Sequence, residues 1–188
     1  MAAPHSTPDL LDAAVQVRRA ARDAARARTG FRHVLTALSR VLEYDHASLT
    51  RWDPAHRRHT TLAGTYPEHA TAYIENRLHH DPVFAVLHHP ARGGLWLTDV
   101  PAPLLAASPG FTDVLRPLGI AGGVAQCLFT AEGRYAGMLN LSTRRPRRAP
   151  DAARAALTLL TESLAAPEAP PDGPPPDPRT PPAAPAPE

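Results

Sequence analysis

The sequence predicts an α/β fold of the α+β kind, in which a central antiparallel sheet carries the terminal helices on one face and a helical insert on the other. Strand-like runs follow one another in two hairpin pairs, amphipathic helical patterns stand at both ends of the folded body, and a mostly helical stretch at 67–118 interrupts the strands. Adjacent strands joined by turns favour antiparallel pairing. The insert is the only material left to cover the second face of the sheet, and we expect a pocket beneath it.

Composition divides the 188 residues into three parts. Residues 1–29 are predicted to form a basic amphipathic helix, residues 30–166 the folded domain, and residues 167–188 a proline-rich tail. Half of the tail is proline and its only hydrophobic residues are alanine, so it cannot bury enough apolar surface to fold. We therefore expect a disordered, flexible tail; a role as ligand for an aromatic groove is the alternative.

The first two helices are predicted from capping signals and from the spacing of apolar residues. One begins at Thr7 and Pro8, continues to about Arg28 and is stopped by Gly30. A second has its apolar residues at i, i+3, i+4, i+7, i+10 and i+11 between 31 and 42. Arginines spaced by four residues share one face of the first helix: Arg18, Arg22 and Arg26. A solvated basic face is the simpler interpretation, and a docking face for a partner or an acidic polymer is the alternative.

The remaining elements are read from alternating patterns and turn signals. The predicted strands lie at 46–52, 59–66, 95–99, 124–130 and 134–144. The predicted helices lie at 67–78, 81–89, 111–119 and 151–165. Asp53-Pro54 separates the first two strands, and Glu132-Gly133 turns the last hairpin.

Charge and cysteine content narrow the setting of the protein. All 20 basic residues are arginine, and the mild excess of positive charge is too small to indicate a nucleic-acid partner. Cys127 is the only cysteine, so no intramolecular disulfide forms and a reducing compartment is the simpler interpretation. No signal peptide and no apolar run long enough to cross a membrane is recognisable. We expect a soluble, cytoplasmic protein with no membrane partner and no direct nucleic-acid binding.

No group of residues in the sequence is typical of an enzyme or of a metal site. The chain has no GxSxG elbow, no P-loop and no dinucleotide-binding GxGxxG motif. The histidine pairs His79-His80 and His88-His89 lack the HExxH spacing or the Cys/His ladder that would complete a metal site. We therefore expect no catalysis, no metal and no cofactor, and we interpret Cys127 as a small buried residue.

An ordered set of residues across roughly 30–165 resembles a known family. The set comprises Tyr66-Pro67, Tyr73, Asp81-Pro82-Val83, Trp96, Phe111, Gly119-Ile120, Gly123 and the hairpin 133–142. In this order it resembles the GAF-type sensory domain of actinobacterial LuxR-like regulators, and more distantly the autoinducer-binding domain of acyl-homoserine-lactone receptors. The resemblance implies a GAF/PAS-like sandwich. Such domains usually precede a helix-turn-helix, and since none follows here we expect a sensor without an attached reader.

The resemblance also implies roles for individual residues. In the receptors the aspartate of the DPV element accepts a hydrogen bond from the ligand's amide and the later tryptophan packs on its ring, roles that would fall to Asp81 and Trp96. Asn140 stands where the receptors carry a small hydroxyl residue facing the pocket. Ala70 stands in place of the tryptophan that holds the lactone carbonyl, so we do not predict a lactone. Asp81 before Pro82 also suits a helix N-cap, and Trp96 also suits an ordinary core position.

Two functions are compatible with these observations. The first is a non-enzymatic, small-molecule-sensing domain in signalling or transcriptional control, which buries a partly apolar ligand. Its candidate ligand-binding residues are Tyr66, Tyr73, Asp81, Phe84, Trp96, Phe111, Met138 and Asn140. Strand alternation would turn Met138, Asn140 and Ser142 to the pocket, and Leu139 and Leu141 to the helices. The alternative is an interaction or dimerisation module with a vestigial pocket, which acts as a homodimer or on a partner through residues 9–28 and the final helix.

Overall fold

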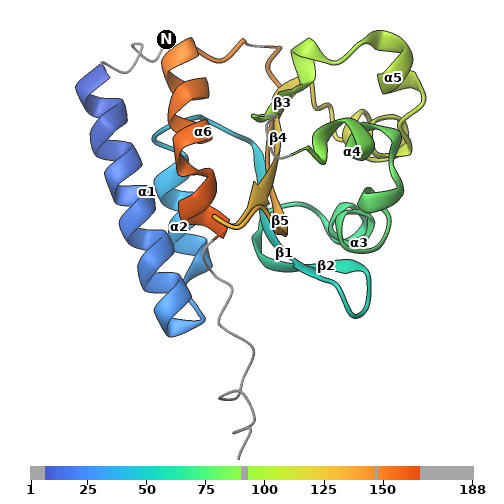
Figure 1. Cartoon of the computed structure of the whole chain (residues 1–188). Helices are drawn as coiled ribbons and strands as arrows, with labels where there is room; N and C mark the ends of the chain where they lie inside the picture. Colours follow the sequence, from blue (N-terminus) through green and yellow to red (C-terminus); the bar gives the residue numbers. More distant parts are fainter. Residues whose placement is uncertain (1–6, 90–92, 147, 166–188) are drawn as a thin grey trace, which may run out of the picture.

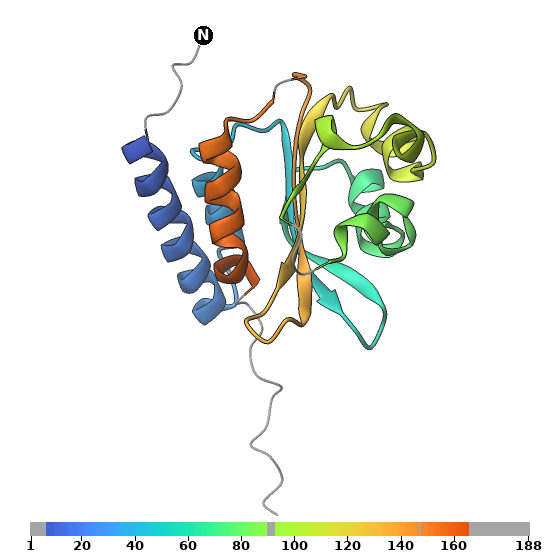
Figure 2. The same cartoon turned by 45° about the horizontal axis from the view of Figure 1, so that its top comes forward.

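The computed structural model describes residues 7–89, 93–146 and 148–165, and these form layers on both sides of a central sheet (Figure 1). Helices α1 (Thr7–Ala27), α2 (Phe31–Leu38) and α6 (Asp151–Ala165) lie on one side of the sheet. The insert between the first and second strand pairs lies on the other side, as the turned view in Figure 2 also shows. The tail predicted for residues 167–188 lies outside the described residues.

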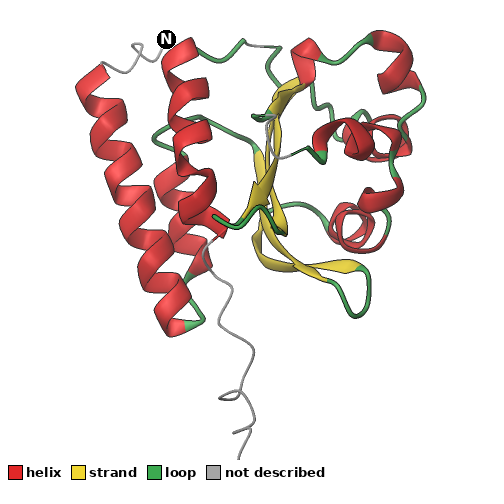
Figure 3. Ribbon diagram, viewed as in Figure 1, coloured by secondary structure: helices red, strands yellow, loops and turns green. Residues whose placement is uncertain are grey.

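The sheet has five strands, each antiparallel to its neighbours (Figure 3). The strands are β1 (His46–Asp53), β2 (Arg58–Gly64), β3 (Leu95–Trp96), β4 (Gly122–Phe129) and β5 (Tyr135–Thr143). Their order is β2-β1-β5-β4-β3, so β1 and β5, far apart in sequence, lie side by side in the centre. This confirms the predicted antiparallel α/β architecture with helices on both faces.

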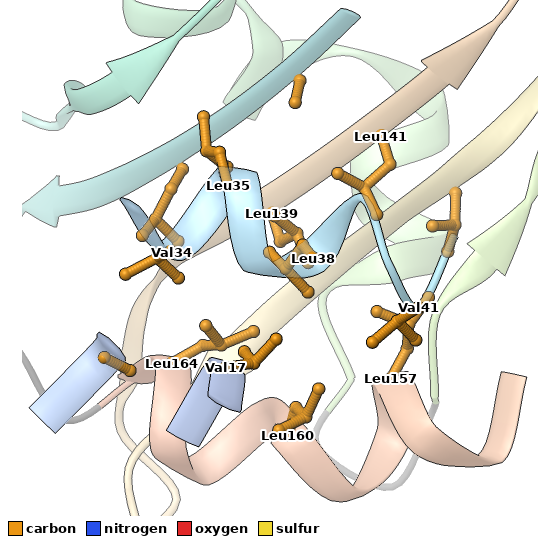
Figure 4. Close-up of a cluster of buried hydrophobic side chains, with 14 of the residues drawn as sticks. Val17, Val34, Leu35, Leu38, Val41, Leu139, Leu141, Leu157, Leu160 and Leu164 are labelled. Carbon is orange, nitrogen blue, oxygen red and sulfur yellow. The ribbon is translucent and has the colours of Figure 1, made fainter. Parts of the chain in front are cut away.

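The core lies between the sheet and the terminal helices (Figure 4). Leu139 and Leu141 of β5 project towards the helices, where they meet Leu157 and Leu160 of α6 and Leu38 of α2. All five side chains are fully buried, and burial of a leucine stabilises the fold by about 1.5–3 kcal/mol. Period-two alternation in β5 and i, i+3 spacing in α6 therefore produce the same interface.

Helix α1 forms a further layer outside α2 and α6 and packs on both of them (Figures 1 and 2). Its inner stripe consists of Leu10, Ala13, Val17, Ala21 and Ala24, all buried. Small alanine side chains in the second half of this stripe let the helix approach its neighbours closely. The predicted N-terminal helix is therefore part of the same hydrophobic core as the domain that follows it.

The insert contains short helices where the sequence predicts them and one that it does not. Its α-helices are α3 (Glu68–Asn76), α4 (Pro82–Leu87) and α5 (Ala102–Ala106), and a π-helix (Gly110–Leu115) follows them. A single 3-10 turn (Leu78–His80) lies between α3 and α4. α5 was not predicted. Pro101 is its N-cap and Pro103 lies in its first turn, where proline is tolerated because no backbone donor is lost.

Several predicted elements are shorter in the structure, and two of them differ most from the prediction. The predicted helix 31–42 ends at Leu38, because the amides of Arg40 and Val41 bond to carbonyls three residues back instead of four. Of the predicted strand 95–99 only Leu95 and Trp96 pair with β4. The chain then tightens into a single 3-10 turn at Leu97–Asp99 and leaves the sheet for the insert.

Candidate ligand pocket

A cavity of about 100 Å³ lies between the sheet and the insert. A cavity of roughly 10–15 Å³ holds a single water molecule, so this one has room for a compact organic ligand. Its floor comes from β4 and β5, and its walls come from α3, α4 and the segment 97–120. Most of its lining is aliphatic or aromatic, with a few polar side chains among them, which is the usual composition of a small-molecule site.

The floor of the cavity follows from strand alternation along β5. Asn140 and Ser142 line the cavity, while Leu139 and Leu141 between them belong to the helix-side core. Asn140 Nδ2 donates a hydrogen bond to Ser48 Oγ at 3.1 Å, and the hydroxyls of Ser142 and Tyr66 lie 2.6 Å apart. Burial raises the pKa of the Tyr66 phenol to about 12, so this hydroxyl remains protonated.

Asp81 is the most heavily bonded side chain in the cavity wall. Its Oδ1 accepts the amide of Val83 at 2.9 Å, which is the predicted N-cap of α4. Its Oδ2 accepts from the Tyr73 hydroxyl at 2.7 Å, from Ser108 Oγ at 2.9 Å and from the Gly110 amide at 2.9 Å. Burial and the hydrogen bond to Asp81 raise the pKa of Tyr73. Asp81 is only 4% exposed, and its carboxyl group joins three separate segments of the insert.

Five of the eight candidate residues lie around this cavity: Tyr66, Tyr73, Asp81, Phe111 and Asn140. The other three do not line it. Phe84 and Met138 face the insert side but lie in a neighbouring apolar cluster together with Cys127. There burial raises the pKa of the Cys127 thiol to about 12, and it is not a reactive thiolate.

The placement of Trp96 is a correction to the predicted pocket. Trp96 pairs with Val124 across the sheet, and both side chains belong to the helix-side core. The guanidinium of Arg154 on α6 lies 4.5 Å from the centre of the indole ring. Since side chains alternate along a strand, the neighbour Leu95 lines the cavity instead.

Sequence reasoning missed Ser108 and Gly110, the two partners of Asp81 from the segment 97–120. A signal was present, because a serine followed closely by proline is typical of a helix start. Ser108 Oγ accepts the amide of Phe111 at 3.1 Å, as an N-cap side chain does. What the sequence could not reveal is that the same hydroxyl reaches a carboxyl group 27 residues earlier.

A cluster of histidine and aromatic rings joins strands β1, β2 and β5 to the insert. His59, 1% exposed, has its Nε2 2.7 Å from the Tyr135 hydroxyl, and its ring lies beside those of Trp52, His79 and Phe84. Burial lowers the pKa of His59 to about 4, and the nearby His79 is a second, smaller cause. Within the described residues, no three histidine, cysteine or acidic side chains are grouped so that they could hold a metal ion.

Comparison with known proteins identifies both the family and the fold. The family model for the autoinducer binding domain matches residues 20–166. No curated protein matches the sequence significantly. Among the described helices none combines the length and the apolar character that a membrane crossing requires.

Solved structures with this fold include sensory domains from several bacteria. The GAF domain of a phosphoenolpyruvate-protein phosphotransferase from Coxiella burnetii has a TM-score of 0.64 at 17% identity, over 86% of this chain and 94% of that one. The phytochrome photosensory core module of Stigmatella aurantiaca has a TM-score of 0.58 at 15% identity, over 87% of this chain and 37% of that one. Escherichia coli SdiA has a TM-score of 0.54 at 26% identity, over 79% of this chain and 65% of that one.

Proposed function

The chain belongs to the autoinducer-binding domain family, and on this premise we propose that it senses a small, mostly apolar molecule bound between the sheet and the insert. The observation that carries the proposal is the cavity itself, an apolar space in which Tyr66, Tyr73, Asp81, Asn140 and Ser142 supply polar groups from the walls and floor. Apolar surface of the ligand would be buried against Phe111 and its aliphatic neighbours, and the polar groups would fix its orientation.

The chemistry of the lining supports binding rather than catalysis. The Asp81 carboxylate is held by four hydrogen bonds from the protein, and the phenol of Tyr66 is kept protonated by burial. A phenol held in its protonated form by burial is not prepared to take up a proton at neutral pH. The proposed output is a change in the terminal helices, which share the opposite face of the sheet and would bias a partner or a regulatory domain.

Native mass spectrometry of the protein purified from its own host tests the proposal. The expected result is a small molecule that stays bound under native conditions and is lost on denaturation. Val114 lines the cavity and is buried, so Val114→Phe should fill the space and abolish binding. Leu159→Phe, on the exposed face of α6, is the matched control and should bind normally. Equal occupancy in both variants would place the ligand elsewhere.

A second candidate function, a dimerisation or docking module, is favoured by one observation. Three large apolar side chains of the terminal helices are exposed: Leu11 by 62%, Val15 by 63% and Leu159 by 78%. Light scattering should then detect a dimer in the full chain that is lost in the double variant Leu11→Ser, Val15→Ser, with the helical circular dichroism unchanged. If the full chain and the double variant were both monomeric, the dimerisation function would be contradicted and only the sensing function would remain.

A further inference from the structure

Three segments of the insert meet at a single carboxyl group. Tyr73 comes from α3, Asp81 itself precedes α4, and Ser108 and Gly110 lie at the start of the π-helix. All three donors converge on one oxygen, Asp81 Oδ2, at 2.7–2.9 Å. Hydrogen bonds to an ionised group are about twice as strong as those between neutral groups, so this junction is a concentrated source of stability for the insert.

The backbone at Gly110 is shaped for this junction. A Cβ at this position would lie 2.9 Å from Asp81 Oδ2 and 3.0 Å from Cε1 of Tyr73. Any other residue would therefore push the π-helix away from the carboxyl group or force Tyr73 aside. Glycine lets the Gly110 amide donate its hydrogen bond directly to Asp81.

The same π-helix covers the cavity. Phe111, Val114 and Leu115 line the cavity from this side. The Arg116 amide donates to the Phe111 carbonyl five residues back, which is the hydrogen bond of a π-helix. π-helical turns are rare and less well packed than α-helices, and they occur often at functional sites. The cover of the cavity is thus a short, irregular segment attached at one end through Asp81.

We propose that Tyr73, Asp81, Ser108 and Gly110 form a latch that holds the segment 108–116 closed over the cavity, and that this segment opens as a unit while the sheet stays folded. The opening would give a ligand its way in, and a ligand that donates a hydrogen bond to Asp81 would replace one of the latch donors. Ser108 and Gly110 are positioning residues in this scheme. The part played by the ligand rests on the function proposed above; the latch itself does not.

Amide hydrogen exchange on the full chain, without any ligand, tests the latch. Ser108→Ala removes the bond to Asp81 and the side-chain acceptor of the Phe111 amide. Loss of a hydrogen bond to a charged group should raise the opening equilibrium, and hence exchange of amides 110–116, by about tenfold or more. Amides of β4 and β5 should change by less than about twofold, because the sheet does not take part in local opening.

Two further variants make the result decisive. Asp81→Asn keeps the shape of the side chain, but its amide group presents either an N–H donor or an uncharged oxygen to the three donors of the latch. This variant should therefore open the same segment. Thr36→Ala on α2 removes a hydroxyl that donates to the Arg32 carbonyl, far from the cavity, and should leave amides 110–116 unchanged. Unchanged exchange of 110–116 in Ser108→Ala would overturn the latch, and so would equal acceleration in the sheet. Absence of a ligand in mass spectrometry would contradict the sensing function and leave this measurement unaffected.

Discussion

At Asp81 one side chain combines a local role with a long-range one. The N-cap of α4 follows from the Asp-Pro pair and was predicted, whereas the bonds to Tyr73, Ser108 and Gly110 depend on how the insert folds back. The sequence could indicate that Asp81 mattered, but the number of its partners is a property of the tertiary structure.

Asp81→Ala should destabilise the fold and not only weaken binding. The variant leaves four donors without their acceptor, and each unsatisfied buried donor costs about 1–3 kcal/mol, partly relieved by water reaching the site. We expect the free energy of unfolding in urea to fall by about 3 kcal/mol. Asn140→Ala, which loses only the bond to Ser48, is the matched control and should cost about 1 kcal/mol. A loss at Asp81 no larger than that at Asn140 would contradict this interpretation of the junction.

His59 should make the protein sensitive to acid. Its pKa is about 4 in the folded chain and about 6.5 in the unfolded chain, so the unfolded state takes up a proton first as the pH falls. The full stability is present above about pH 6.5, and about 2 kcal/mol should be lost by pH 5. Nearby His79 and His88 add to this lowering of the pKa, while the backbone of Ile74 and the charge of Glu75 oppose it.

The measurement is the free energy of unfolding at pH 7.5 and pH 5 for the native chain and for His59→Gln. The glutamine variant cannot take up the proton, so its stability should fall much less between the two pH values. The Tyr135 hydroxyl remains available as a partner in both chains. An equal loss in both would mean that other groups cause the acid sensitivity.

At the scale of elements, local pattern predicted the strands, and tertiary packing decided where the short pieces end. The hairpin β4–β5 and helix α6 follow from alternation, turn residues and capping that are complete within a few residues. β3 and the π-helix do not, because their geometry depends on β4 and on Asp81 respectively. Trp96 is an example. In a strand of two residues, the neighbouring residues in the sequence do not reveal which face of the sheet a side chain occupies.

The pairing of β4 with β5 depends on a glycine near the start of β4. Gly123 has φ +133°, and a Cβ there would lie 2.2 Å from the Leu141 carbonyl oxygen of β5. Gly123→Ala should therefore separate the two strands and cost about 3 kcal/mol or more. Gly133→Ala is the control: φ is also positive, +77°, but nothing lies within 4 Å, so only about 1 kcal/mol is expected. Comparable urea midpoints for the two variants would contradict the steric argument.

At the scale of the whole molecule, α1 closes the core instead of standing apart from it. Val17 and Ala21 are buried against the layer formed by α2 and α6. Composition predicted residues 1–29 as a part distinct from the folded domain, since the arginine-rich face dominates the sequence there. The buried stripe on the opposite face is mostly alanine and gives a weak signal.

Removal of residues 1–29 should expose the outer apolar surface of α2 and α6. We expect this shortened chain to bind the dye 8-anilinonaphthalene-1-sulfonate and to aggregate on size-exclusion chromatography. The variant Leu11→Ser, Val15→Ser changes only the exposed face of α1 and should remain free of both effects. A well-behaved shortened chain without dye binding would show that α1 is dispensable for the core.

The edge strand β3 has one side chain on the cavity face of the sheet and one on the helix face. Leu95 faces the cavity, and its neighbour Trp96 faces α6, where the Arg154 guanidinium rests on its ring and is paired with Asp99 at 2.7 Å. Like β2 at the opposite edge, β3 is hydrogen-bonded to one strand only, in this case β4. We therefore expect a molecule that displaces Leu95 to shift Trp96 against Arg154 as well. Such a shift would pass a change in the cavity through the two residues of β3 to helix α6.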